Sequence, residues 1–276
     1  MNHYFASDIH LGAGGEAFAG ETERRFVAWL DDAAKDAESI FLVGDLFDFW
    51  FEYREVVPKG FVRTLGKLAE LTDRGVRVVF FTGNHDMWVG DYLARECGVE
   101  VYTSPQRFCL NGKHLFIAHG DNMKIDGQPV LKLLNTVFRS RTLRWLFSWL
   151  LHPDWAMRFG HWWSGKSRKS HAADTLDVSL TEPLIQYARE YAVGHDVDHF
   201  VFGHMHFPRD FREGNLHDKP RLLGTVSLLC RFGRVGRNDV EEARSVPLVR
   251  GRGAARCSAR KKCLFERKKM SIKEER

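Results

Sequence analysis

The chain is poor in cysteine and has no long apolar run, and these absences exclude several classes of protein. Five cysteines in 276 residues, without regular spacing, do not make a disulfide framework, so we expect a reducing compartment. No stretch reaches the roughly 18 consecutive apolar residues that suggest a transmembrane helix. The first residues, MNHYFASDIHLG, hold neither a basic nor a long apolar segment, so we expect no secretory signal.

Apolar residues make up 44% of the chain, which is enough to bury a core. The net charge is +5, but it is unevenly placed. Residues 225–276 carry fifteen basic and six acidic residues, and residues 138–170 carry seven basic residues and one acidic residue. The rest of the chain is therefore net acidic. A protein that binds nucleic acid through a basic surface is one interpretation of the bulk charge, and the acidic body opposes it.

Short apolar runs alternate with helical patterns along residues 1–130. The expected strands are Tyr4–Ser7, Ser39–Val43, Val76–Thr82, His114–Ala118 and, further on, Asp198–Phe202, and the expected helices are Thr22–Lys35 and Gly60–Arg74. This alternation predicts an α/β fold. Each of these strands ends in a polar or glycine-rich loop, and ligands of such sheets bind at the carboxyl ends of the strands.

Residues 128–170 differ from the rest and predict a helical insertion. Pro129–Phe138 and Thr142–Leu151 have helical patterns, Pro153 interrupts the second, and a long helix is expected over Ala172–Tyr191. Five of the eight tryptophans lie in this insertion among basic residues. Such a segment suits a membrane surface or an acyl chain, and it is also compatible with a helical cap packed on the domain.

The C-terminal segment has neither a helical nor a strand period. RLLG at 221–224 has the pattern of a strand end, and we place one domain at residues 1–224 and an atypical basic tail at 225–276. We expect this tail either to be disordered or not to be the natural C-terminus of the chain.

Five short polar blocks each follow an expected strand. They are D-x-H, G-D, G-N-H-D, H-G and G-H-x-H, and they contain Asp8, His10, Asp45, Asn84, His85, Asp86, His119, His204 and His206. Carboxylate, imidazole and amide oxygen suit Mn²⁺, Fe or Zn, and the absence of cysteine argues against a structural zinc. Two metals about 3.5–4 Å apart need a bridging anion, for which Asp45 is suited, and such a pair activates water and neutralises phosphoryl charge. Any one block could be a turn or a cap, but all five together favour a metal site.

In this order the blocks resemble those of the calcineurin-like metallophosphoesterases, over about residues 1–224. The resemblance implies a layered αββα sandwich with a helical lid inserted at about 128–170. It implies two divalent metal ions, one held by Asp8, His10, Asp45 and His206 and the other by Asp45, Asn84, His119 and His204. It also implies that His85, oriented by Asp86, acts as an acid or charge stabiliser near the leaving oxygen.

Three further features narrow the substrate: the aromatic extension GDLFDFWFEY, the tryptophan-rich insertion, and SGKSRK at 164–169. Ordinary packing or a solvated basic loop would explain each one alone. Together they resemble the UDP-2,3-diacylglucosamine pyrophosphatases of lipid A biosynthesis. That resemblance implies hydrolysis to 2,3-diacylglucosamine 1-phosphate and UMP, usually with Mn²⁺. The enzyme would be cytoplasmic and peripheral on the inner membrane of a Gram-negative bacterium, and its substrate contacts would be Asn84, His85, Ser164, Lys166, Ser167 and Lys169.

Two departures and several alternatives remain. Many members of that family have arginine where this chain has His85, and further strands usually follow the RLLG segment. Another phosphodiesterase, a nuclease or a protein phosphatase would use the same metal blocks, although the acidic body opposes binding to a nucleic-acid backbone. A scaffold that keeps the fold without catalysis predicts eroded ligands, and none of the expected positions is eroded.

Overall fold

The computed structural model describes residues 2–14, 16–123, 133, 136–172, 182–206, 209–211 and 225–228. Four parallel strands make the first sheet in the order β1-β2-β3-β4, and their bounds are β1 Asn2–Ala6, β2 Ala37–Val43, β3 Arg77–Phe81 and β4 Glu100–Tyr102. Three helices connect them: α1 Glu16–Ala33, α2 Val62–Asp73 and α3 Tyr92–Cys97. The strand–helix alternation predicted from the sequence is therefore confirmed.

The second sheet has the order β5-β6-β7-β9-β8. Its strands are β5 Gln106–Leu110, β6 Lys113–Ala118, β7 His199–Phe202, β8 Arg209–Phe211 and β9 Thr225–Leu228, and the helix beside it is α7 Glu182–Gly194. Strands β6, β7 and β9 are parallel, whereas β5 and β8 pair antiparallel to their neighbours at the two edges. The sheet thus includes the first four residues of the segment that the sequence assigns to the basic tail.

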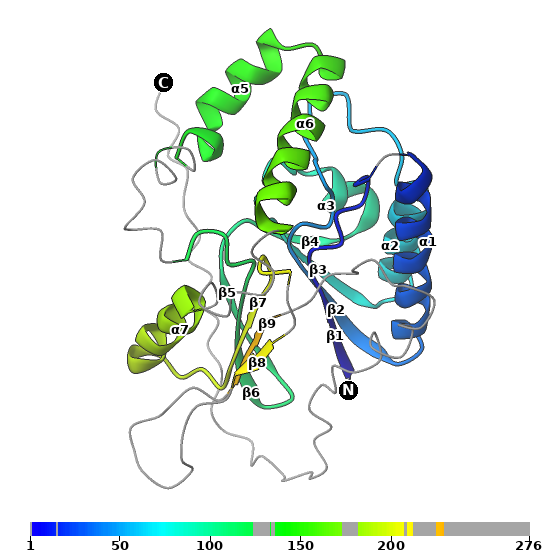
Figure 1. Cartoon of the computed structure of the whole chain (residues 1–276). Helices are drawn as coiled ribbons and strands as arrows, with labels where there is room; N and C mark the ends of the chain where they lie inside the picture. The colour runs from blue at the N-terminus through cyan, green and yellow to red at the C-terminus, as the bar shows by residue number, and fades with distance from the viewer. Residues whose placement is uncertain are drawn as a thin grey trace, which may run out of the picture.

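The two sheets lie face to face, with helices on their outer faces (Figure 1). The run SIFLV in β2 is buried on both sides, which is why it is continuously apolar. Ile40 and Leu42 pack with α1 and α2, whereas Phe41 and Val43 pack against Leu115 and other residues of the second sheet. On the other side, α7 covers the second sheet. This is the αββα sandwich expected from the sequence.

Two helices stand beyond the ends of the strands (Figure 1): α5 Arg141–Leu150 and α6 Pro153–Ala172. Helix α5 confirms the expectation for Thr142–Leu151, and Pro153 interrupts the pattern because it begins the next helix, where a proline lacks no needed N–H. The sequence did not predict α6, and the basic segment SGKSRK is helical rather than a loop. The helix expected at Ala172–Tyr191 is confirmed from Glu182 onward by α7, and residues 173–181 lie outside the described residues.

Aromatic side chains join this lid, α5 and α6, to the body. The ring of Phe51 lies 5.0 Å from Phe147 and 5.4 Å from Trp88, measured between ring centroids. The indole N–H of Trp88 donates to the carbonyl of Phe138, at 2.8 Å. The aromatic extension of the second polar block therefore anchors the lid. Most of the helix expected at Pro129–Phe138 and the RLLG segment lie outside the described residues, and no described helix is long and apolar enough to cross a membrane.

Candidate metal centre

The five polar blocks meet at one edge of the sandwich. They follow β1, β2 and β3 of the first sheet and β6 and β7 of the second, at the carboxyl end of each strand. The backbone adopts a left-handed conformation at Asp8, His10, Asp45, His204 and His206, with φ between 50° and 70°. For residues other than glycine this conformation costs about 1–2 kcal/mol each. Such a concentration of strained residues indicates that their side-chain positions serve a function.

Small residues allow the loops to approach each other closely. A Cβ atom on Gly83 would lie 2.1 Å from Oδ1 of Asp45, and one on Gly203 would lie 2.0 Å from Oγ of Ser7. Both distances are far below van der Waals contact, so no side chain fits at either position. The G-N-H-D and G-H-x-H blocks therefore need glycine at these positions, because the carboxylate of Asp45 and the hydroxyl of Ser7 occupy the space that a side chain would fill.

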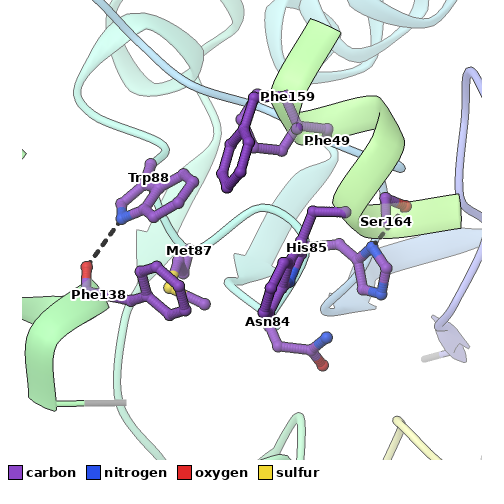
Figure 2. Close-up of a pocket in the computed structure, with 10 residues that line it drawn as sticks. Phe49, Asn84, His85, Met87, Trp88, Phe138, Phe159 and Ser164 are labelled. Atoms are coloured by element: carbon purple, nitrogen blue, oxygen red, sulfur yellow. Dashed lines mark hydrogen bonds between the residues drawn. The ribbon is translucent and has the colours of Figure 1, made fainter. Parts of the chain in front are cut away.

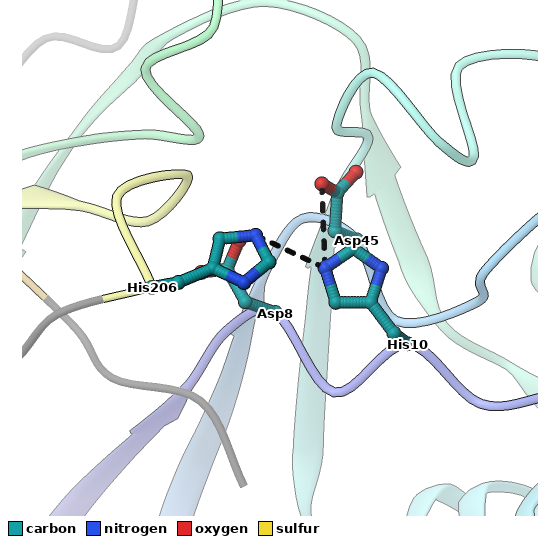
Figure 3. A group of neighbouring side chains, drawn as sticks. All are labelled: Asp8, His10, Asp45 and His206. Carbon is teal, nitrogen blue, oxygen red and sulfur yellow. Dashed lines mark hydrogen bonds and ion pairs between the residues drawn. The ribbon is translucent and has the colours of Figure 1, made fainter. Parts of the chain in front are cut away.

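The first cluster contains Asp8, His10, Asp45 and His206, whose candidate ligand atoms all lie within 4.8 Å of one another (Figure 3). Nε2 of His10 faces Nε2 of His206 at 3.2 Å and lies 3.9 Å from Oδ2 of Asp45. Nε2 of His206 also lies 3.5 Å from Oδ1 of Asp8. Two imidazole nitrogens and two carboxylates that converge on one point make a donor set suited to a divalent cation.

The second cluster contains Asp45, His119 and His204. Nε2 of His119 lies 3.3 Å from Oδ2 of Asp45 and 3.3 Å from the amide oxygen of Asn84. Nδ1 of His119 is 2.9 Å from the carbonyl oxygen of Val43, which can only accept, so Nδ1 carries a proton and Nε2 is the nitrogen that faces the cluster. The structure thus brings together all seven residues expected at the two metals, and Asp45 belongs to both clusters.

One buried oxygen tests whether the clusters fit metal ions. Oδ1 of Asp45 accepts a hydrogen bond from the backbone N–H of His85, at 2.9 Å. Oδ2 of Asp45 is buried and accepts no hydrogen bond from any described residue. A buried carboxylate oxygen without a donor is costly, and a cation shared between the two clusters would remove that cost. The residues therefore fit a pair of divalent cations.

The protonation of the two clusters reflects the same demand for positive charge. Burial raises the pKa of Asp8 to about 7. Burial would also raise the pKa of Asp45, but the charges of His119 and His85 hold it well below its usual range. Burial opposes the charge on His119, yet Asp45 raises the pKa of its imidazole well above the ordinary value. Protons thus supply in part the charge that cations would supply.

His85 and Asp86, which were expected to act as a pair, have different hydrogen-bond partners among the described residues. The Asp86 carboxylate accepts hydrogen bonds from the backbone N–H groups of Gly83, at 2.7 Å, and Phe47, at 3.2 Å. It therefore fixes the loops after β2 and β3, and burial raises its pKa to about 7. Nδ1 of His85 instead lies 2.9 Å from the backbone carbonyl oxygen of Asp48 and 3.0 Å from Oγ of Ser164.

Asp48 is the functional residue that sequence reasoning missed. It is the second aspartate of GDLFD, and it is buried beside His10, whose Nδ1 lies 3.7 Å from Oδ1 of Asp48. It also accepts a hydrogen bond from Ser164, at 2.6 Å. Its position three residues after Asp45 could have indicated this role. The loop that carries Asp45 also carries Asp48, which therefore lies close to the same site.

Of the expected substrate contacts, Asn84, His85 and Ser164 line a small pocket between the lid and the body (Figure 2). Its other walls are largely aromatic and include Phe49, Trp88, Phe138, Phe159 and Trp163. Lys166, Ser167 and Lys169 belong to α6, but their side chains lie outside what the structure describes. The cavity thus joins the metal clusters to an apolar space, as a substrate with a phosphate and an apolar part requires.

Comparison with known proteins gives consistent matches. A family model described as calcineurin-like phosphoesterase matches residues 1–208. The chain is 39% identical over 234 residues to a UDP-2,3-diacylglucosamine hydrolase from Porphyromonas gingivalis, which covers 80% of this chain and 87% of that protein. It is 28% identical over 214 residues to a protein of the same name from Pseudomonas aeruginosa, covering 76% and 84%. A solved structure from Streptococcus pneumoniae, a predicted phosphoesterase, has a TM-score of 0.36 at 14% identity and covers 83% of this chain and 71% of that one, which is too low a likeness for any argument.

Proposed function

The chain belongs to the calcineurin-like phosphoesterase family, and on that premise we propose that it hydrolyses the pyrophosphate bond of UDP-2,3-diacylglucosamine. The products are 2,3-diacylglucosamine 1-phosphate and UMP, and the reaction belongs to lipid A biosynthesis. The observation that carries the proposal is the position of two metal clusters that share Asp45, directly beside an aromatic cavity under a helical lid. The names of the relatives from P. gingivalis and P. aeruginosa support the same substrate.

Two divalent cations, which we take to be Mn²⁺, would complete the site. One is held by Asp8, His10, Asp45 and His206, and the other by Asp45, Asn84, His119 and His204. When bound, they supply Lewis acidity, which neutralises charge on the phosphoryl oxygens and lowers the pKa of the attacking water. Asp45 belongs to both sets because its Oδ2 lies 3.9 Å from Nε2 of His10 and 3.3 Å from Nε2 of His119. The backbone carbonyl of Val43 holds the ring of His119 so that Nε2 faces inward.

His85 serves the leaving phosphate. Because the carbonyl of Asp48 can only accept, Nδ1 of His85 carries a proton, and Nε2 is the nitrogen available to the substrate. In its doubly protonated form the ring also carries a proton on Nε2, and from that nitrogen it stabilises or protonates the leaving oxygen. Asn84 and His85 line the cavity next to the clusters, which supports their contact with the phosphates. Lys166, Ser167 and Lys169 supply cations and a hydroxyl for the phosphates and the glucosamine.

The lid shelters the acyl chains and contacts the membrane. The aromatic cavity lies between the lid and the body, and acyl chains would be protected from water there. On α5, Trp145 and Trp149 are 63% and 72% exposed, and Leu150 is exposed beside them. Exposed tryptophans on a helix with basic residues favour an anionic lipid surface. The proposed location is therefore the cytoplasmic face of the inner membrane of a Gram-negative bacterium, with the protein bound peripherally.

The deciding experiment is an assay of the purified chain with Mn²⁺ and UDP-2,3-diacylglucosamine. We expect release of UMP, which disappears in Asp45→Ala because both clusters lose a ligand. Asp73→Ala is the matched control, since this exposed carboxylate lies at the far end of α2. Hydrolysis of generic phosphodiesters without any hydrolysis of the lipid nucleotide would refute the substrate and leave another phosphoesterase activity.

A further inference from the structure

We propose that Ser164 is a positioning residue through which the lid helix α6 holds His85 in its working orientation. The proposal rests on the role of His85 in the proposed function. In this proposal Ser164 binds the side chain of His85 and not the substrate phosphate. His85 is then correctly oriented only when α6 is packed against the body of the protein.

The hydrogen bonds around Ser164 carry the first step. The side chain is 1% exposed, and its Oγ lies 2.6 Å from Oδ1 of Asp48 and 3.0 Å from Nδ1 of His85. The Asp48 carboxylate accepts, so the hydroxyl proton of Ser164 points to it and a lone pair faces His85. Nδ1 of His85 carries the proton because it also faces the carbonyl of Asp48, at 2.9 Å. One N–H is therefore held between two acceptors, and this fixes the position of that proton and the rotation of the ring. Figure 2 shows the contact between His85 and Ser164.

The close approach of α6 to the body carries the second step. Ala156, Gly160 and Ser164 are spaced four residues apart, so they share one face of the helix, and all three are buried. A Cβ atom on Gly160 would lie 2.3 Å from three carbons of the Phe49 ring. Only glycine allows this separation. Because Gly160 is one turn from Ser164, the depth to which α6 seats on Phe49 determines whether the serine hydroxyl reaches His85.

The two acceptors come from different parts of the chain. Asp48 belongs to the loop that also carries Asp45, whereas Ser164 belongs to the lid and is 116 residues further along. With the lid seated, both acceptors hold the His85 ring. With the lid displaced, only the carbonyl of Asp48 remains, so the ring gains freedom to rotate. The arrangement couples closure over the substrate to the alignment of the acid.

The kinetic test uses two aryl esters of UMP in the presence of Mn²⁺, one with phenol and one with p-nitrophenol as leaving group. We expect Ser164→Ala to lower kcat for the phenyl ester on the order of 10-fold, as for other positioning partners, with KM nearly unchanged. The p-nitrophenyl ester needs little help in leaving, so its kcat should change much less. In a His85→Gln background, Ser164→Ala should cost nothing further. A loss that appears in KM, or that persists fully in that background, would show that Ser164 binds substrate and would overturn the proposal.

A second pair of variants tests the lid. Gly160→Ala forces α6 away from Phe49 and should reproduce the kinetic pattern of Ser164→Ala. Gly66→Ala is the matched control, because it lies in helix α2 and an added Cβ meets nothing within 4 Å. Full activity of Gly160→Ala on the phenyl ester would contradict the coupling between the seating of the lid and His85.

A measurement without substrate separates this inference from the proposed function. In ¹⁵N-labelled protein, the Nδ1–H of His85 should exchange slowly with solvent in the wild type and faster in Ser164→Ala. Ser148→Ala is the control, since that hydroxyl donates only within α5, to the carbonyl of Trp145. An unchanged exchange rate in Ser164→Ala would overturn the inference. If the aryl esters are hydrolysed but UDP-2,3-diacylglucosamine is not, the proposed function fails while Ser164 is still tested.

Discussion

The ring of His119 occupies the space next to Gly44 so closely that a Cβ atom on Gly44 would lie 2.3 Å from its Nδ1. The two residues come from different sheets, since Gly44 follows β2 and His119 follows β6. The glycine that precedes Asp45 thus leaves space for the ring of His119 in the second cluster. The glycine of the G-D block is therefore needed because of the histidine of the H-G block.

The first prediction follows from this contact. Gly44→Ala should displace His119 and reduce the number of tightly bound Mn²⁺ ions from two to one, with at least a 100-fold loss of turnover. Gly75→Ala is a close control: Gly75 has the same φ of +85°, but an added Cβ meets nothing within 4 Å. It should cost only the backbone strain of about 1–2 kcal/mol and keep both ions. Metal content measured by elemental analysis distinguishes the two, and two bound ions in Gly44→Ala would contradict the geometry.

The second prediction concerns pH. In the metal-free fold the pKa values of Asp8 and Asp86 are raised to about 7, so both keep protons that the unfolded chain releases near pH 4. Because the pKa of His119 is also raised, the folded chain keeps a further proton above pH 7 that the unfolded chain releases. Because the folded chain holds more protons, the free energy of unfolding should fall as pH rises from about 5 to 8.

Urea denaturation at several pH values, with EDTA or with Mn²⁺, checks this prediction. Bound cations keep Asp8 ionised and His119 neutral, so the dependence on pH should become weaker with Mn²⁺. A metal-free chain that gains stability between pH 5 and 8 would show that the buried carboxyl groups are not protonated in the fold.

The third prediction concerns the lid surface. The rings of Trp145 and Trp149 are stacked, with centroids 6.4 Å apart and planes 7° apart, and both are exposed. Replacing both by serine should weaken binding to phosphatidylglycerol-containing vesicles on the order of 10-fold, which corresponds to about 1.4 kcal/mol of lost apolar burial. Val193→Ser, at an 88% exposed position on α7, should leave vesicle binding unchanged. Equal partitioning of the tryptophan variant and the wild type in vesicle sedimentation would exclude α5 as the membrane contact.

The fourth prediction concerns a carboxylate with a structural role. Glu52 accepts hydrogen bonds from the backbone N–H groups of Gly90, Asp91 and Tyr92 at the start of α3, at 2.8, 2.9 and 3.0 Å. Glu52→Gln turns an N–H toward these donors and should lower the free energy of unfolding by about 2 kcal/mol. Glu96→Gln, exposed on the same helix, should change it by less than about 0.5 kcal/mol. Both variants should bind two Mn²⁺ ions, and equal stability of the two would refute the role of Glu52.

The fifth prediction concerns the C-terminal boundary. Strand β9 lies between β7 and β8, and its register pairs Phe200 with Val226 and Phe202 with Leu228. A chain that ends at Gly224 loses this strand and should unfold at lower urea concentration than a chain that ends at Leu229. The chain that ends at Leu229 should keep the turnover of the full chain, because it retains β9. Equal stability of the two truncated chains would show that β9 does not contribute to the sheet.

The sequence was sufficient to predict the metal clusters because each ligand directly follows a strand with a clear apolar pattern. Asp8 and Asp45 could be placed together since parallel strands end at the same edge. The partner of His85 could not be predicted in the same way. Ser164 is brought to it by tertiary contact across 116 residues from Asp48, and no local pattern records that contact.

Helix α6 shows the same limit for the fold. Its segment WWSGKSRKS contains glycine and several serines, which have a modest helix propensity, so the local pattern favoured a loop. Packing of Gly160 against Phe49 outweighs that preference. The short elements α3, β4 and β8 were also missed, because elements of three to six residues have too few positions to show a period.

Each metal cluster takes residues from both sheets: Asp8 and Asp45 come from the first sheet, and His119, His204 and His206 come from the second. These residues are separated by up to 198 positions, so neither cluster exists until both sheets have paired and faced each other. Cations held by these residues would therefore bind only once the two sheets have come together. Their stabilisation would then act mainly on the unfolding rate and little on the folding rate. Such a metal pair would cross-link finished sheets and prolong the lifetime of the folded chain without helping it to form.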